Sequence, residues 1–198
     1  MPWVVKIKNT YDSLSQVEME NNANIMFSLI GGLMTLSAFA GILGNAQWES
    51  YINPGQWQGS YAVGDMDGGY GLVMWTPARK IFDIVGYDGD AQTMAIVNLT
   101  SNDWIPTASY PQSFEEFKRL NTDPEHAAAV FCYNYERAGS VHLAERQTYA
   151  RNWYNYFYGK EPGPGPGPGP GPGPGPGPGP APVSARRMKI YMYLNKFR

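Results

Sequence analysis

A run of twenty residues without a charged side chain, Ile25 to Gly44, places the strongest constraint on how this chain of 198 residues can fold. A stretch of that length and apolarity would also suit a membrane-spanning helix. Gly31 and Gly32 divide it into two short halves, however, and Thr35 is a residue type that favours the start of a second helix. We therefore expect two buried helices joined by a glycine corner, with no stable membrane insertion.

Local signals set the bounds of these two helices. Ser15 with Glu18 three residues later is a capping-box pattern, which predicts a first helix over about 14–30. The second helix is expected over about 36–50, because the segment 53–55, Asn-Pro-Gly, cannot continue it. About 24 mixed polar residues precede the apolar run, so we expect no signal peptide.

The second helix delivers one acid, Glu49, close to its C-terminal end. That end of a helix carries a partial negative charge, and Trp48, Tyr51 and Trp57 are close in sequence, so the charged carboxylate is disfavoured. A carboxylic acid that keeps its proton near neutral pH is what general acid catalysis needs. On spacing alone, a solvated helix-end glutamate explains the pattern at least as well.

Composition argues against several classes of function. Residues 1–161 hold all 17 acids against ten Lys and Arg, a net charge of −7, which disfavours nucleic acid as the main partner. The single cysteine, Cys132, cannot form an internal disulfide and lies in an apolar helical stretch. Two histidines without a nearby Cys or carboxylate cluster give no metal-site spacing, so we expect no metal and no cofactor.

The rest of the main domain is expected to be helical after one region of strands. Short strands are predicted over 56–75, joined by a turn at 65–69. The further predicted helices span about 77–85, 90–99, a short segment after Ser113, 124–138 and 141–157.

The C-terminal part of the chain has a different composition. Residues 162–182 repeat Gly and Pro with a period of two, which excludes collagen and predicts an extended, solvated linker. Residues 183–198 contain five basic residues and no acid, with apolar positions alternating from 188 to 194. We therefore divide the chain into a domain at 1–161, a disordered linker at 162–182 and a basic tail at 183–198, which is either a solvated tail or a docking segment.

Three blocks of sequence, in order, resemble the phage tail lysozymes. They are GNAQWES with INPG at 44–55, GGYGLVMWTP at 68–77, and AAAVF through YER at 127–137. The resemblance covers roughly residues 14–158. It implies an α+β, mainly helical, lysozyme-like fold in which a helix faces a small β-hairpin region across a cleft.

The resemblance also implies a peptidoglycan hydrolase, a muramidase that cleaves the bond between N-acetylmuramic acid and N-acetylglucosamine. Glu49 matches the catalytic glutamate of the family. Glycoside hydrolysis usually needs a second carboxylate, and Asp67 is our first choice for it, ahead of Asp65. Turn chemistry explains both aspartates equally well. A retaining, an inverting or a lytic transglycosylase route stays open.

Four polar or aromatic residues are candidates for contact with the glycan: Gln47, Trp57, Tyr70 and Trp75. Core packing is an equally good explanation for Trp75. Many family members carry Gln where this chain has Met74, which puts substrate contacts there in doubt. A structural, hydrogen-bonded role is expected for Glu136, which belongs to the third resembling block.

The expected setting is the tail of a virion acting on the bacterial cell wall, after a period in the host cytoplasm before assembly. The expected partners are peptidoglycan strands and, through the basic tail, other phage tail proteins. Two other functions stay open: a non-catalytic tail or wall-binding protein on the same fold, and a small membrane-disrupting protein built on residues 25–44.

Overall fold

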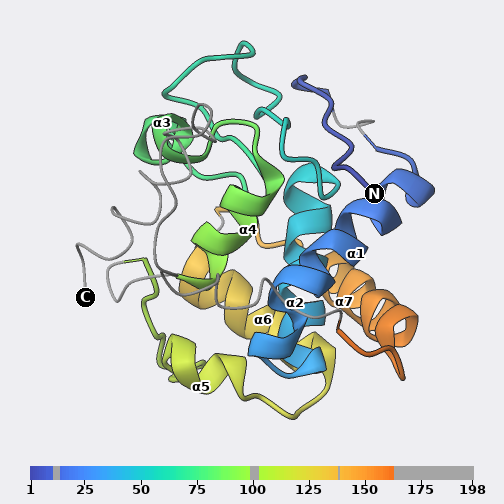
Figure 1. The fold of residues 1–198 in the computed structure, drawn as a ribbon. Coiled ribbons are helices and arrows are strands. Elements are labelled where there is room, and N and C mark those ends of the chain that lie inside the picture. The colour runs from blue at the N-terminus through green and yellow to red at the C-terminus, as the bar shows by residue number, and fades with distance from the viewer. Residues whose placement is uncertain (11–13, 99–102, 138, 163–198) are drawn as a thin grey trace, which may run out of the picture.

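The computed structural model describes residues 1–10, 14–98, 103–137 and 139–162, and over these ranges the protein is mainly helical (Figure 1). The basic tail, and the linker beyond Pro162, lie outside the described residues. The α-helices are α1 (Gln16–Ile30), α2 (Leu36–Ser50), α3 (Phe82–Val85), α4 (Gly89–Val97), α5 (Phe114–Lys118), α6 (Pro124–Phe131) and α7 (Leu143–Phe157). Shorter turns are η1 (Gly31–Leu33), η2 (Ala78–Lys80) and η3, a π-helical turn (Cys132–Glu136).

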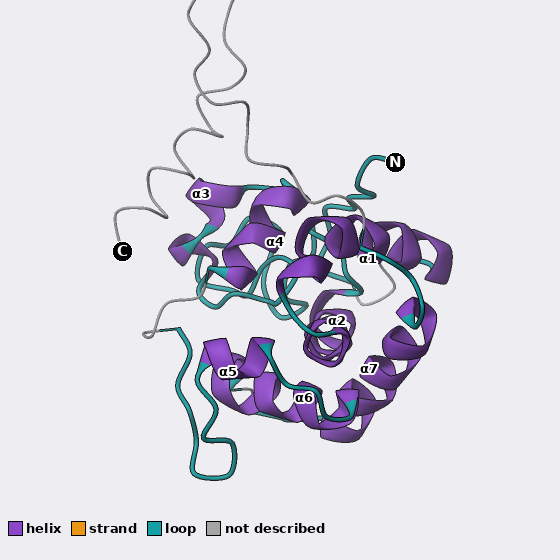
Figure 2. Cartoon of the chain, turned by 60° about the horizontal axis from the view of Figure 1, so that its bottom comes forward, coloured by secondary structure: helices purple, strands orange, loops and turns teal. Residues whose placement is uncertain are grey.

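Helix α2 is the centre of the molecule. Figure 2 looks nearly along its axis, with α1, α4, α6 and α7 arranged around it. Every residue from Ser37 to Ala46 is buried, because α2 has neighbours on all sides and needs no polar face. The uncharged run is thus the core of a globular domain, and within the described ranges no helix has the length and apolarity to cross a bilayer.

The caps of the first two helices agree with the sequence patterns. The Ser15 hydroxyl and the Glu18 carboxylate complete the capping box at the start of α1. The Thr35 hydroxyl accepts a hydrogen bond of 3.2 Å from the Ala38 amide at the start of α2. Between them, Gly31 opens the 3₁₀ turn η1, which is the predicted glycine corner.

Two glycines let the later helices approach the centre of α2. A Cβ atom on Gly41 would lie 2.8 Å from the Ala127 carbonyl carbon of α6, and one on Gly44 would lie 2.8 Å from the Ala150 amide of α7. Both distances are shorter than side chains tolerate, so the backbones of α6 and α7 rest directly on α2. This close packing fixes α7 against the end of α2 that carries Glu49.

Between α2 and α3 the chain departs from the predicted strands and helix. In this described segment, Trp57 pairs with Tyr70 and Tyr70 with Trp75 only as isolated bridges. Turns interrupt the segment repeatedly, and Gly71 (φ 82°) and Met74 (φ 47°) have left-handed backbones that extended strands do not use. The helix predicted over 77–85 is divided into η2 and α3.

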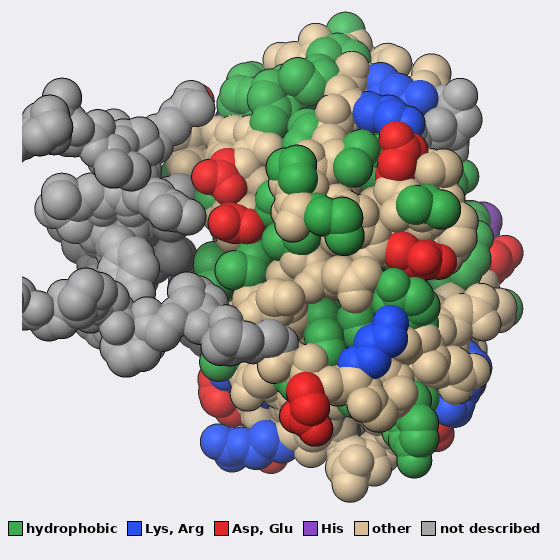
Figure 3. Space-filling view, turned by 45° about the vertical axis from the view of Figure 1, so that its right-hand side comes forward, with side chains coloured by type: hydrophobic (Ala, Val, Ile, Leu, Met, Phe, Trp, Pro, Cys, Tyr) green, Lys and Arg blue, Asp and Glu red, His purple; other side chains and the backbone are tan. Residues whose placement is uncertain are grey.

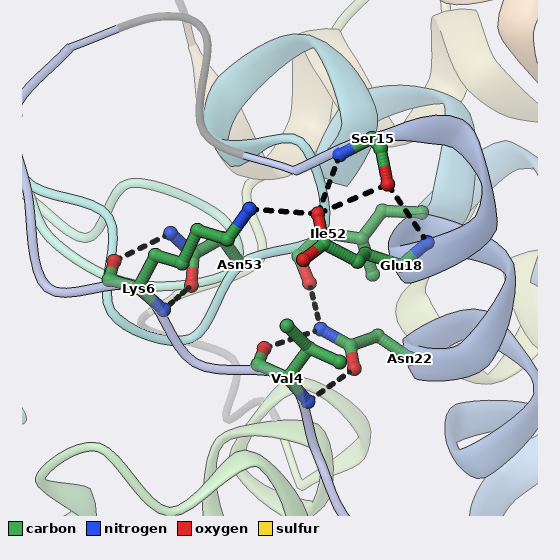
Figure 4. A network of polar contacts seen from close by, with 7 residues as sticks. All are labelled: Val4, Lys6, Ser15, Glu18, Asn22, Ile52 and Asn53. Carbon is green, nitrogen blue, oxygen red and sulfur yellow. Dashed lines mark hydrogen bonds and ion pairs between the residues drawn. The ribbon is translucent and has the colours of Figure 1, made fainter.

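The N-terminal arm is held against α1 and the end of α2 by two asparagines (Figure 4). Asn22 accepts from the Val4 amide (2.8 Å) and donates to the Val4 carbonyl (2.8 Å), as a neighbouring strand would. Asn53 makes the same pair of bonds with Lys6, at 3.0 and 2.7 Å. The Lys6 ammonium also reaches Glu18 at 2.7 Å, so the arm is bound at three successive points.

The surface is chemically mixed on the face drawn in Figure 3. Acidic and basic side chains lie singly or in pairs there, among apolar and uncharged polar groups. Some large apolar side chains are well exposed, such as Val17 on α1 and Leu33 on η1. Scattered exposed residues of this kind are normal for a folded domain and mark no site by themselves.

Candidate functional site

A cavity of about 740 Å³ opens at the C-terminal end of α2. Its walls come from four parts of the chain: the last turn of α2, the end of η3, the start of α7, and the irregular segment around Gln58, Met74 and Thr76. The site is therefore assembled by the close packing of α7 on α2, and the segment of isolated bridges contributes a further part of its wall.

Glu49 stands on the wall of this cavity, one residue before the end of α2. Its side chain is 17% exposed, so the carboxyl is sheltered and still reachable from the cavity. The helix ends directly after it, because Tyr51 takes a left-handed conformation (φ 57°) and the chain turns away.

Arg146 of α7 is the partner of Glu49, with one guanidinium N–H donating to Glu49 Oε1. Its side chain is only 1% exposed. Other N–H groups of the Arg146 guanidinium donate to Asn45 Oδ1 at 2.8 Å and to the Val141 carbonyl at 2.8 Å. These bonds hold the guanidinium, and with it the Glu49 carboxyl, in a fixed place on the cavity wall.

Asn45 completes the support of this pair from inside α2. Its amide nitrogen donates to the Gly41 carbonyl (2.8 Å) and to the Ala128 carbonyl of α6 (3.0 Å), and its oxygen receives Arg146. A buried network in which every member is bonded is rigid. Arg146, and through it Glu49, is therefore held to one geometry.

Glu136, the last residue of η3, is a second carboxyl on the same cavity. Its Oε1 atom is shielded from solvent and has no hydrogen-bond partner among the described residues. Burial, and next the negative charge of Glu49, raise the pKa of Glu136 well above its usual range, while Arg146 and Arg137 act in the opposite direction. The structural hydrogen bonds expected for Glu136 are thus missing at Oε1.

Asp67, the predicted second carboxylate, lies elsewhere. Its side chain is 68% exposed, forms an ion pair with Arg79, and does not line the cavity. The Asp67 amide donates to Asp65 Oδ1 at 3.0 Å, which is a side-chain turn of the ordinary kind. Turn chemistry accounts for both aspartates, and Glu136 has the place at the cavity that we expected for Asp67.

The residues predicted to contact the glycan are divided between the cavity and the core. Gln47 lines the cavity, and its Oε1 accepts from Trp153 Nε1 at 2.8 Å. Trp57 and Tyr70 are fully buried in a second hydrophobic cluster, with ring centroids 4.8 Å apart, so neither offers a ring face to a ligand. Trp75 is half-buried and donates to the Tyr135 hydroxyl at 2.5 Å, outside the cavity lining.

Aromatic residues other than the predicted Trp57, Tyr70 and Trp75 line the cavity. Trp48 stacks on His142 with ring centroids 4.5 Å apart, and Tyr51 and Tyr149 also line the walls. The sequence carries a partial signal for Trp48 and Tyr51, because both lie within two residues of Glu49. No spacing rule connects Arg146 itself to Glu49, since 97 residues separate them.

Unusual backbone conformations are concentrated around the cavity. Of the five described residues other than glycine that have positive φ, four line it: Tyr51, Met74, Arg137 and His142. Residues of this kind cost free energy and cluster at functional sites, where the surrounding structure holds them. The observation supports the cavity as the functional site independently of its acids.

Metal and thiol chemistry find no support at this cavity. Among the described residues, no group of three His, Cys, Asp or Glu side chains could hold a metal ion. Cys132 is buried, and burial raises the pKa of its thiol to about 11, so it is a poor nucleophile. The chemistry that the cavity can offer is that of two carboxyls, two arginines, a histidine and a partly aromatic wall.

Comparison with known proteins shows a family and a relative that this chain resembles. The family model for phage tail lysozyme matches residues 20–157. Morphogenesis protein 1 of Bacillus phage B103 is 35% identical over 162 residues, which is 77% of this chain and 43% of that protein. The chain thus spans less than half the length of this relative.

Proposed function

Because the chain belongs to the phage tail lysozyme family, we propose that it cleaves the glycosidic bond between N-acetylmuramic acid and N-acetylglucosamine in peptidoglycan, with Glu49 as the essential carboxyl. The observation that carries the proposal is the position of Glu49: sheltered, on the wall of the cavity, and held by the buried Arg146. Glu49 therefore belongs both to a sequence block that resembles the family and to the wall of the cavity.

Glu49 acts as the general acid in this proposal. It gives a proton to the glycosidic oxygen as the bond between that oxygen and the anomeric carbon breaks, and positive charge develops on the sugar. Water then adds to the anomeric carbon and supplies the proton that returns the acid to its starting state. If the muramyl hydroxyl attacks in place of water, the product is an anhydro sugar and the enzyme is a lytic transglycosylase.

The cavity has the size and chemistry for a short stretch of glycan. Pockets for small ligands have volumes of roughly 300–1,000 Å³, and this one has about 740 Å³. Trp48, Tyr51 and Tyr149 supply flat apolar surface against which sugar rings stack, and Gln47 supplies an amide for a hydroxyl or acetamido group. We assign substrate contact to these residues in place of Trp57, Tyr70 and Trp75.

The setting that we propose is the tail of a phage particle. The family is named for tail lysozymes, and the Bacillus phage relative is named a morphogenesis protein, so this chain acts on the cell wall as part of the virion. The basic tail at 183–198 would contact other tail proteins or anionic wall polymer. Deleting residues 183–198 should then reduce incorporation into the virion or wall binding.

Analysis of digestion products tests the proposed reaction. The 198-residue chain is incubated with purified peptidoglycan, and soluble fragments are identified by mass spectrometry. Fragments with a new reducing N-acetylmuramic acid end indicate a muramidase, and anhydro ends indicate a transglycosylase. Binding to the wall without release of either fragment would instead support a non-catalytic tail protein.

A further inference from the structure

We propose that Gln47 and Gln58 recognise the N-acetyl groups of the glycan, each donating a hydrogen bond from its side-chain amide to an acetamido oxygen. The proposal rests on the function proposed above, and it names the chemical group of the substrate that the cavity selects. Both side chains line the cavity and are half-buried, Gln47 on α2 and Gln58 in the segment of isolated bridges. The two amides therefore come from two different parts of the cavity wall.

The orientation of the Gln47 amide follows from its partner. Trp153 Nε1 donates to Gln47 Oε1 at 2.8 Å, and Trp153 is only 3% exposed. An indole N–H donates and cannot accept, so the amide oxygen of Gln47 faces Trp153 and the NH₂ group turns away from it. Among the described residues no group accepts from Gln47 Nε2, and this atom is not sealed in the core. Its N–H groups are thus left for a ligand in the cavity.

Gln58 is held in a similar way by the backbone. The Gly69 amide donates to Gln58 Oε1 at 2.8 Å, and the Gln58 amide donates to the Gly69 carbonyl at 2.9 Å. Because a backbone N–H only donates, the side-chain oxygen of Gln58 is again fixed toward the protein. Within the described ranges its NH₂ group likewise has no partner. The cavity thus presents two oriented amide donors.

A fixed donor selects for a group that can only accept. A sugar hydroxyl rotates either to donate or to accept, so an oriented NH₂ group distinguishes poorly between hydroxyls. A carbonyl oxygen only accepts, and each sugar of an N-acetylated glycan carries one in its acetamido group. A donor that loses its acceptor on binding costs free energy, so a glycan without N-acetyl groups should bind less well. The geometry therefore favours N-acetylated over de-N-acetylated glycan.

The test compares purified peptidoglycan with the same material after chemical de-N-acetylation, with the initial rate at low substrate followed as new reducing ends. We expect the wild type to prefer the N-acetylated form, and chemical re-acetylation to restore the rate. Gln47→Met and Gln58→Met each remove one neutral hydrogen bond, so each should reduce this preference about three- to tenfold. Gln147→Met is the matched control and should keep the full preference, because Gln147 is half-buried on α7 and outside the cavity lining.

Gln47→Glu tests the direction of the hydrogen bond. A carboxylate oxygen still accepts from Trp153, so the contact that holds the side chain remains, but the second oxygen offers the cavity an acceptor in place of a donor. The preference for N-acetylated glycan should then fall at least as far as in Gln47→Met. Trp153→Phe removes the indole donor and frees the amide to turn, so we expect an intermediate preference once circular dichroism shows that the variant is folded.

Two results would overturn the proposal. Equal losses on both forms of the glycan in Gln47→Met and Gln58→Met would mean that the amides contact hydroxyls or only support the wall. Equal cleavage of both forms by the wild type would mean that the cavity does not recognise N-acetyl groups.

A binding experiment separates this proposal from the proposed function. If the wild type cleaves neither form of peptidoglycan, the proposed function fails, and isothermal titration calorimetry of the 198-residue chain still tests the two amides. The probes are the trimers of N-acetylglucosamine and of glucosamine. Tighter binding of the N-acetylated trimer, with the difference reduced in Gln47→Met, would support the assignment, and equal binding of the two trimers would contradict it.

Discussion

The guanidinium of Arg146 and the carboxylate of Glu49 meet across the contact between α7 and α2, with the arginine almost fully buried and the glutamate on the cavity wall. Gly44 makes this contact possible, because a Cβ there would lie 2.5 Å from the Arg146 carbonyl. The position of the proposed catalytic acid thus depends on a small residue five positions before it in α2.

Replacing Arg146 tests how strongly the pair supports the fold. Arg146→Ala leaves Glu49 and Asn45 without their partner, and the loss of one member of a buried ion pair costs about 3–5 kcal/mol of unfolding free energy. Arg146→Lys keeps the charge and loses the fork, so its cost should be smaller. Urea denaturation measures both values.

Arg151→Lys on the same helix is the control for these variants. Its ion pair with Glu125 is 40% exposed on the arginine side, and pairs of that kind contribute only about 0–1 kcal/mol. Equal losses for Arg146→Lys and Arg151→Lys would contradict the role of the buried network.

Gly44→Ala should be destabilising and should also lower activity. The added methyl group meets the backbone of α7 at Arg146 and Ala150, and overpacking of this kind costs about 1–3 kcal/mol. If α7 is displaced by this methyl group, Arg146, the partner of Glu49, also moves. Gly32→Ala is the matched control, because a Cβ there meets nothing within 4 Å. Thermal unfolding and cleavage assays should separate the two, and similar behaviour of both variants would count against the packing argument.

The extent to which the sequence determines this structure differs between regions. The capping patterns at Ser15 and Thr35 predict the starts of α1 and α2, because a hydroxyl that accepts from a backbone amide acts over three residues and needs no distant partner. The uncharged run likewise predicts burial. The residues from Trp57 to Trp75 mislead, because their aromatic and β-branched types suit strands while the turns between them leave only isolated bridges.

The functional site likewise contains residues that the sequence indicates and residues that it does not. The family pattern points to Glu49, whereas local spacing alone explains a solvated helix-end glutamate at least as well, and Glu49 lies on the cavity wall. Arg146 and Glu136 cannot be connected to it from the sequence, because their proximity arises from the packing of α7 and η3 onto α2 and leaves no local pattern. Nearness in sequence favours Asp67, yet its pair with Arg79 lies on the surface.

Glu136 should make stability fall as pH rises. Its folded-state pKa is raised by burial and by Glu49, so the folded protein holds this proton more tightly than the unfolded chain does. Its contribution is therefore most favourable below the ordinary value of 4.5, and is lost progressively above that pH. Glu136→Gln should remove this loss and raise the melting temperature near pH 7, relative to the wild type.

Glu115→Gln is the control, since the Glu115 side chain is 63% exposed. Melting curves from pH 4 to 8 for the three proteins make the comparison. A Glu136→Gln protein that melts well below the wild type at pH 7 would show that the carboxylate, and not the acid, is the stable form.

Glu18 should have the opposite pH dependence at the N-terminal arm. Lys6 and the Ser15 cap lower its pKa from 4.5 to about 2, so its contribution is present above pH 4.5 and is lost as pH falls toward 2. The protection factors for amide hydrogen exchange at Val4 and Lys6, whose N–H groups bond to Asn22 and Asn53, should fall over this interval once intrinsic exchange rates are corrected for pH. Lys6→Met should move this loss of protection to higher pH, and unchanged protection factors would contradict the assignment.

The most direct test of the central claim compares Glu49→Gln with Asp67→Asn for release of reducing ends from purified peptidoglycan, with folding checked by circular dichroism. Glu49→Gln keeps the shape of the side chain and removes its acid, so we expect a loss of cleavage of about a hundredfold or more, whereas Asp67→Asn should cleave as the wild type does. If Glu49→Gln still releases reducing ends at the wild-type rate, Glu49 is not the catalytic acid and the proposed mechanism is wrong.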